Sequence, residues 1–338
     1  MDINNAKTIQ SEFLKKIEDT IPKNTSLVNE LSDLLNISTD SIYRRMRLET
    51  FLTLEEIIIL SNHFKVSFDT YNSVSENVTF SYSKMESSVD SFYKYLSKLV
   101  KDLEIINQSK EKQIIYACED IPIFHHYRHP ILASFKMFYW VNAILSIAEF
   151  ENEKFDSEVI PNELQELGQK AIDLYTNIPS IEIWTETTIQ SSVKQIEYLW
   201  ESGKFKSISD VLAVCNALKE EINLVKKQAE NGTKIFCNQN TDDDNSNNYK
   251  LYYSDLEITN NCVLVQLGNT KSVYLGHFTF NTMSTFNDSY GKETLNWLNI
   301  IMRKSVLISG VSEKIRYQIF RKYLKQIEDL ETRINSKE

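Results

Sequence analysis

The residues from Ser38 to Arg47 carry the side chains best suited to contact a nucleic acid. If this segment forms a helix, the side chains that face outward are Thr39, Asp40, Tyr43, Arg44 and Arg47. These residue types reach base edges and phosphates. Ser38 precedes them and can accept a hydrogen bond from the first backbone amides of the helix as its N-cap. These six residues, Ser38 included, are the predicted DNA contacts.

Two short helices joined by a tight turn must position these side chains. Leu31 and Leu35 are four residues apart and fall on one face of the first helix. Asn36 follows at the turn, where Asn tolerates the left-handed backbone conformation better than most residues. Ile42 and Met46, again four apart, attach the second helix to the first. This spacing predicts a helix-turn-helix.

The segment resembles the helix-turn-helix of the Cro/CI-type regulators, also called XRE or lambda-repressor-like. Where the family reads Leu-Gly-Val-Ser, this chain has Leu35-Asn36-Ile37-Ser38. Residues 53–56 (TLEE) match a T-x-x-E capping box at the start of the fourth helix. The family phrase I-A-x-x-L-x-V-S-x-D is matched by Leu54, Ile57, Leu60, Ser61, Phe64, Val66, Ser67 and Asp69. The resemblance covers roughly residues 8–71 and implies a five-helix DNA-binding domain over residues 1–72. Arg45 departs from it, because the family has an apolar residue there, and we expect Met46 to supply the lost contact.

The charge of this domain limits how tightly one copy can hold DNA. Residues 1–72 contain 8 Lys and Arg but 11 Asp and Glu, and the whole chain has a net charge of -10. The predicted first and recognition helices carry a local basic set: Lys15, Lys16, Arg44, Arg45 and Arg47. So small a set neutralises few phosphates and gives a shallow salt dependence. We therefore expect a homodimer on double-stranded DNA.

The composition indicates a compact, largely helical protein. Of its 338 residues 42% are hydrophobic, and only 7 are Gly and 5 are Pro, which suits two or three domains. The cysteines form no C-x-x-C pair and are expected as buried thiols of a reducing cytosol; they are Cys118, Cys215, Cys237 and Cys262. The chain shows no signal-peptide pattern, and its most apolar stretch, residues 135–147, is too short to cross a bilayer. We expect a cytoplasmic protein without membrane contact.

Two apolar seams suggest where subunits join. After a linker over residues 73–84, a heptad pattern runs through Met85, Val89, Phe92, Leu96, Leu99, Leu103 and Ile106. The apolar residues that flank it favour burial in a helical bundle over a free dimer coil. The last predicted helix carries a second seam at Phe320, Tyr323, Ile327, Leu330 and Ile334. Both seams are candidates for the dimer interface.

The rest of residues 85–338 is predicted to form an effector-sensing or oligomerisation domain, helical over residues 85–230. Helices are expected from Pro130 to about Glu149 and over 162–176, 181–202 and 207–230. An aromatic-rich segment from His125 to Trp140 is expected to border an apolar cavity for a small molecule or short peptide. The predicted pocket residues are Phe124, Tyr127, Phe135, Tyr139 and Trp140.

Residues 231–248 are expected to form a flexible loop, and the sequence pattern after them is typical of β-strands. An antiparallel meander is predicted over Tyr249 to Thr259, Cys262 to Gly268 and Ser272 to Asn281. Two helices, over residues 290–305 and 311–335, close the chain. The expected fold class is therefore mainly α with a small antiparallel β meander (α+β).

The sequence offers little for metal binding or catalysis. His125, His126 and His129, with Cys118 upstream, are the only cluster of metal-type ligands, and we interpret them as polar loop residues. Nucleophile-elbow, P-loop, dinucleotide-binding and zincin motifs do not occur. No catalytic residue, metal or cofactor is expected. The sequence thus favours a transcriptional regulator; the alternatives are a helix-turn-helix protein that acts through protein contacts, and an enzyme with an appended DNA-binding domain.

Overall fold

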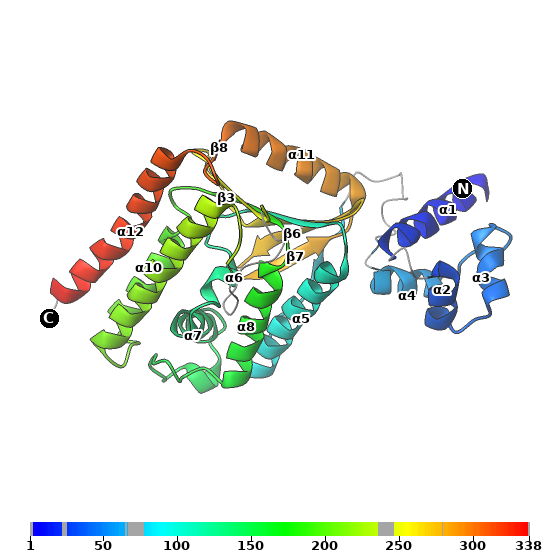
Figure 1. The fold of residues 1–338 in the computed structure, drawn as a ribbon. Coiled ribbons are helices and arrows are strands. Elements are labelled where there is room, and N and C mark those ends of the chain that lie inside the picture. The colour runs from blue at the N-terminus through cyan, green and yellow to red at the C-terminus, as the bar shows by residue number, and fades with distance from the viewer. Residues whose placement is uncertain are drawn as a thin grey trace.

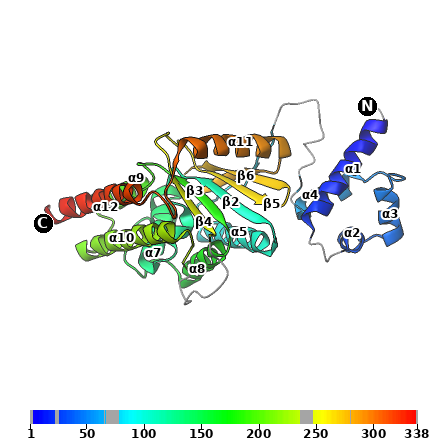
Figure 2. The ribbon, with the colours of Figure 1, turned by 45° about the horizontal axis from the view of Figure 1, so that its top comes forward.

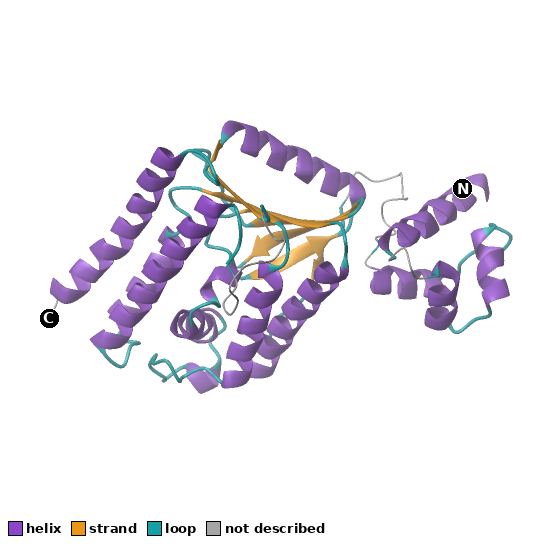
Figure 3. Ribbon diagram, in the orientation of Figure 1, coloured by secondary structure: helices purple, strands orange, loops and turns teal. Residues whose placement is uncertain are grey.

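The computed structural model describes residues 3–21, 26–64, 66, 78–235, 247–278 and 280–336. A small helical module at the N-terminus lies beside a larger body of helices and strands (Figure 1, Figure 3). Within the described ranges, no helix combines the length and the apolar character that crossing a membrane would require.

The N-terminal module contains four helices up to Phe64: α1 (Ile3–Thr20), α2 (Leu27–Leu35), α3 (Thr39–Met46) and α4 (Leu54–Phe64). They enclose a small core of their own, formed by Phe13, Leu14, Ile17, Leu27, Val28, Leu31, Ile42, Leu52, Leu60 and Val66. The five-helix domain implied by the family resemblance is therefore seen only in part. Ser67 and Asp69, which the resemblance also used, lie outside the described residues.

The body is built on one eight-stranded mixed sheet. Its strands follow the order β1-β7-β6-β5-β2-β3-β4-β8. Their bounds are β1 (Ser81–Tyr82), β2 (Lys112–Ala117), β3 (Ser180–Trp184), β4 (Tyr249–Tyr253), β5 (Cys262–Leu267), β6 (Thr270–His277), β7 (Asn281–Thr285) and β8 (Val306–Leu307). β2, β3 and β4 are parallel to one another, and every other pairing is antiparallel.

This mixed α/β sheet corrects the predicted small meander. The hairpin of β5 and β6 lies where strands were expected, but β4 pairs in parallel with β3 and not with β5. β2 and β3 were missed because both faces of each are covered, so they lack the alternation that marks a half-exposed strand. The predicted helix over 181–202 joined β3 to α9 (Gln190–Glu201), which are separate elements.

Helices cover the sheet on both faces (Figure 1, Figure 2). α11 (Asp288–Lys304) lies on one face, where it packs on Ile115, Ile183 and Leu264. The other face carries α5 (Val89–Gln108), α6 (Ile123–His126), α7 (Pro130–Tyr139), α8 (Asn162–Thr176) and α10 (Ile208–Asn231), and α12 (Glu313–Ser336) packs along α10. The helix expected from Pro130 to about Glu149 ends earlier, because a π-turn over Trp140–Ile144 follows α7.

Both apolar seams are used within the chain. The α5 residues Phe92, Leu96, Leu103 and Ile106 are buried in the large core beneath the sheet. The α12 seam is likewise buried, with Phe320, Tyr323, Ile327, Leu330 and Ile334 at most 1% exposed. Neither seam is therefore free to join two subunits, and a dimer would have to use another surface.

Candidate functional site

A short turn with defined caps joins α2 to α3. Asn36 ends α2 in the left-handed conformation, with φ 52° and ψ 44°. The side chain of Ser38 caps α3 by accepting a hydrogen bond from the Ser41 amide at 3.3 Å. Ile42, 1% exposed, anchors α3 in the core of the module. These are the roles that the sequence assigned to the three residues.

The six predicted DNA contacts all lie on the exposed side of α3: Ser38, Thr39, Asp40, Tyr43, Arg44 and Arg47. Tyr43 is 48% exposed. The Nε of Arg47 lies 2.7 Å from Oε1 of Glu49, and the Nε of Arg44 lies 3.9 Å from Oε2 of the same carboxylate. The hydrogen bond from Arg47 lowers the pKa of Glu49. An acidic residue therefore offsets part of the positive charge of this surface.

Two of the basic residues counted toward DNA binding are engaged elsewhere. Arg45 donates from Nε and Nη2 to the carboxylate oxygens of Glu56, at 2.9 and 2.7 Å. Glu56 also accepts the Thr53 amide at 2.9 Å, completing the predicted capping box of α4. Lys16 lies 3.3 Å from Asp288, at the start of α11. Arg45 thus joins α3 to α4 through an ion pair.

A cavity of about 320 Å³ lies between α5 and the sheet. Its walls are apolar: α5 contributes Leu99, Leu103 and Ile106, the sheet contributes Ile114, Val263 and Val265, and Ile121, Phe124, Trp140 and Phe280 complete them. This volume lies at the lower end of the range of about 300–1,000 Å³ typical of small-molecule sites. The cavity is large enough for a small ligand.

Polar side chains lie at two places on this cavity. Lys84, Lys94 and Lys98 line it near β1, where Lys94 pairs with Asp90 and Lys98 donates to the hydroxyl of Ser83 at 3.0 Å. The imidazole of His126 and the ammonium of Lys136 line it beyond the carboxyl end of β2. The cavity thus has polar groups at both places that could orient a bound molecule.

The predicted pocket residues divide into three groups. Phe124 and Trp140 line the cavity. Tyr127 and Phe135 do not, because Tyr127 packs on α8 at Gly168 and Phe135 stacks on Phe205. Tyr139 lines a second, polar hollow of about 370 Å³ beside α9. Aromatic character alone could not show which of these residues line the cavity and which are packed in the core.

A polar cluster that the sequence did not indicate lies between the two hollows. Lys136 donates to Oε1 of Gln195 at 2.7 Å and lies 3.4 Å from Oδ2 of Asp120. Nε2 of His126 lies 3.1 Å from the hydroxyl of Ser192. Burial lowers the pKa of His126 well below its ordinary value, so the ring is neutral at pH 7.

This Ser192–His126 pair lacks the arrangement of a nucleophilic triad. In a triad a carboxylate orients the second nitrogen of the histidine. Here Nδ1 has no hydrogen-bond partner within normal geometric limits, and Asp120 contacts the serine at 3.3 Å instead. Ser192 also lines neither hollow. Ser192 and His126 therefore do not form a nucleophilic triad with Asp120.

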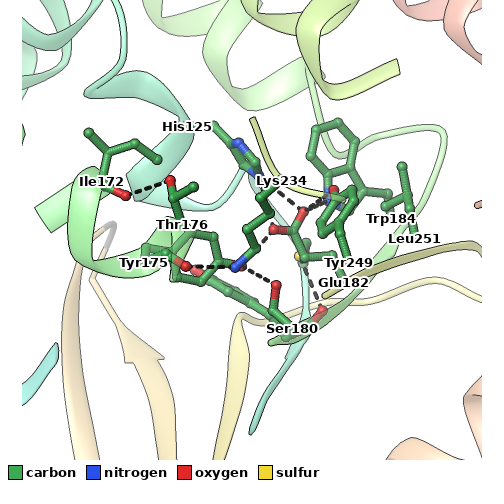
Figure 4. Close-up of polar contacts among 12 residues, drawn as sticks. His125, Ile172, Tyr175, Thr176, Ser180, Glu182, Trp184, Lys234, Tyr249 and Leu251 are labelled. Carbon is green, nitrogen blue, oxygen red and sulfur yellow. Dashed lines mark hydrogen bonds and ion pairs between the residues drawn. The ribbon is translucent and has the colours of Figure 1, made fainter. Parts of the chain in front are cut away.

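A second polar cluster is closed to solvent beneath β3 (Figure 4). The carboxylate of Glu182, 0% exposed, accepts hydrogen bonds from His125 at 2.9 Å, Tyr175 at 2.7 Å, Trp184 at 2.9 Å and Tyr249 at 2.9 Å. These donors come from α6, α8, β3 and β4. The cluster therefore fastens two central strands to the helical layer beneath them.

Cationic groups face both carboxylates of this cluster. Glu221 lies 3.2 Å from Nδ1 of His125 and 3.3 Å from Nε of Arg128. Burial lowers the pKa of His125, but Glu182 and Glu221 together raise it to about 9. Burial likewise raises the pKa of Glu182, but His125 and, to a smaller extent, Tyr175 and the buried Lys234 outweigh it, with a net value of about 2.

The three histidines of the candidate metal cluster turn to different partners. His125 faces Glu182, His126 faces Ser192, and His129 lies 3.1 Å from Glu221. Among the described residues, no group of three or more His, Cys, Asp and Glu side chains could hold a metal ion. Cys118, Cys215 and Cys262 are buried free thiols, and Cys237 lies outside the described residues.

Comparison of the chain with protein families, with curated proteins and with solved structures finds no match. The functional interpretation therefore depends on the residues and geometry above. One signal could have located β3 in the sequence, since Ile181 and Ile183 alternate between Pro179 and a run of threonines. No comparable signal points to the contacts among Asp120, Lys136 and Ser192.

Proposed function

We propose that this protein is a sequence-specific DNA-binding regulator of transcription, with α3 entering the major groove. One observation carries the proposal. A left-handed Asn36 and a Ser38 cap orient α3 so that six polar side chains are exposed along it, while Ile42 holds the opposite side in the core. A helix presented in this way after such a turn is how helix-turn-helix proteins contact base edges.

We further propose that the protein acts as a homodimer and that the α/β body carries an effector site. The supporting argument for a dimer is electrostatic. With Lys16 and Arg45 paired to carboxylates, one module presents few free positive charges, and affinity then requires two modules. Two copies would place their α3 helices about 34–36 Å apart, in successive major grooves. Sedimentation equilibrium at micromolar concentration tests this, and a mass of one chain would contradict it.

The experiment for DNA recognition is selection from a random double-stranded pool by the full-length chain, at fixed and stated salt. The expected result is an enriched sequence with two related half-sites about one helical turn apart. A pool that stays random after repeated rounds would contradict the proposal.

A second function, recognition of a basic protein partner, is favoured by the acidity of the module. Its 72 residues carry 11 acidic against 8 basic side chains. Under this alternative the pool stays random, and substitutions on α3 leave every nucleic-acid measurement unchanged.

A further inference from the structure

The cavity between α5 and the sheet extends along several turns of α5. Its lining residues follow one side of α5 from Tyr95 through Leu99 and Leu103 to Ile106. At 1.5 Å per residue this face spans roughly 16 Å. Opposite it lie apolar side chains of β2 and β5, namely Ile114, Val263 and Val265. A slot with these walls fits an extended apolar chain better than a compact polar molecule.

Four lysines and one carboxylate, that of Asp102, are among the described residues that line the cavity, although the chain has a net charge of -10. Of the lining lysines, Lys94 has Asp90 as its partner and Lys136 has Asp120. Lys84 and Lys98 also line the cavity, and among the described residues neither forms an ion pair with a carboxylate. The ammonium of Lys98 donates to a neutral hydroxyl, that of Ser83, at 3.0 Å. The lining lysines outnumber the one lining carboxylate, and these two charges therefore favour an anionic group at the rim.

We propose that this cavity binds a small amphipathic carboxylate, its apolar chain lying between α5 and the sheet and its carboxylate at Lys84 and Lys98. The part of α5 that lines the cavity, roughly 16 Å long, is long enough for a saturated chain of about ten carbons. His126 also lines the cavity.

The position of the rim gives this site a route to the DNA-binding module, a step that depends on the proposed function. Ser81 belongs to β1 and lines the cavity. In chain order, β1 is the first described element of the body after α4. β1 pairs with β7 at two positions, and Ser83, which follows it, accepts hydrogen bonds from Asn281 and from Lys98, each at 3.0 Å. A carboxylate bound at Lys84 and Lys98 would compete with Ser83 for Lys98 and so act directly on this short strand.

The test measures binding of three ten-carbon probes to the full-length protein by calorimetry: decanoate, decanol and decyltrimethylammonium. We expect saturable binding of decanoate, decanol weaker by about tenfold, and no binding of the cation, since charge-assisted hydrogen bonds add about that factor. Equal binding of all three, or no saturable decanoate binding, would overturn the proposal.

Variants locate the site. Lys98→Met should reduce decanoate affinity by about tenfold without changing decanol affinity. Lys101→Met is the matched control, because Lys101 is exposed on the same helix and does not line the cavity. Leu99→Trp fills the slot and should abolish binding of both probes. Equal effects of Lys98→Met and Lys101→Met would place the ligand elsewhere and overturn the assignment.

A second readout separates this site from the proposed function. DNA affinity is measured with and without decanoate on the selected DNA. If decanoate binds but DNA affinity does not change, the cavity assignment stands and the coupling through β1 is wrong. If the protein selects no DNA, the proposed function fails, and the calorimetric result still decides the cavity.

Discussion

Arg45 and Glu56 form a two-point ion pair that joins α3 to the first turn of α4, with N–O distances of 2.9 and 2.7 Å. Both side chains are largely buried, at 14% and 12% exposure. Burial opposes ionisation of Glu56, but the hydrogen bonds from Arg45 still hold its pKa below the ordinary value. The pair fixes the angle at which α3 is presented and removes Arg45 from the set of free positive charges.

Glu56→Gln should destabilise the N-terminal module by about 1–3 kcal/mol, because it leaves the Arg45 guanidinium with a weaker partner. The measurement is urea unfolding followed by helical circular dichroism. Glu55→Gln is the control, because Glu55 is exposed one residue earlier on α4, and its effect should stay within about 0.5 kcal/mol. Equal stabilities of the two variants would show that the ion pair does not hold α4.

Glu49→Gln should strengthen DNA binding. Glu49 lies 2.7 Å from Arg47, so its charge competes with phosphates for that side chain. Removing the charge should raise affinity by about threefold at low salt, the size expected of one exposed ion pair. Glu12→Gln on α1 makes the same change in net charge away from α3. If both variants bind DNA equally, Glu49 has no local role.

Glu182→Gln should destabilise the body strongly, by about 3–5 kcal/mol, because it removes one of the two carboxylates that face the buried imidazolium and weakens the acceptor of four buried hydrogen bonds. Thermal unfolding of the full chain measures this. Glu186→Gln is the control, because Glu186 and its partner Lys322 are 59% and 57% exposed and should contribute little. A small effect of Glu182→Gln would mean that His125 is neutral in the folded protein.

The same cluster predicts the pH dependence of stability. The pKa of His125 is raised to about 9 from 6.5, so its contribution is complete below pH 6.5 and is lost as the pH rises through 9. The pKa of Glu182 is lowered to about 2 from 4.5, so its contribution is complete above pH 4.5 and is lost as the pH falls through 2. Thermal unfolding across pH 6 to 10 should show falling stability in the wild type and a flatter profile in Glu182→Gln. Parallel profiles would contradict the protonated state of His125.

Local sequence signals predicted the turn between α2 and α3, because its contacts are short-range. Asn36, Ser38 and Ile42 act within a few residues of their partners, and the structure places each in its predicted role. The ion pair of Arg45 was missed because Glu56 is eleven residues away on another helix. The expectation that Met46 replaces the family's apolar contact therefore described only part of this junction.

The body was less predictable, because long-range pairing determines it. β2 pairs with β3 through partners 66 positions apart, such as Ile114 and Ser180, and β3 pairs with β4 across another helical crossover. A buried carboxylate such as that of Glu182 is unfavourable in a strand covered on both faces unless it is hydrogen-bonded, and its four donors come from separate elements that only the fold brings together. The aromatic residues near His125 indicated a dense core, but only the fold could place Phe124 and Trp140 on the cavity and Phe135 away from it.

The most direct test of DNA recognition by α3 is a mobility-shift titration of the selected DNA with the wild type, Arg44→Ala and Arg321→Ala, each against random-sequence DNA. Arg44 is exposed on α3, and Arg321 is exposed on α12, in the α/β body. The account predicts that Arg44→Ala loses about 1–3 kcal/mol of preference for the selected site while Arg321→Ala keeps the wild-type preference. An unchanged preference in Arg44→Ala, with Tyr43→Ala equally unaffected, would contradict the claim that this helix reads DNA.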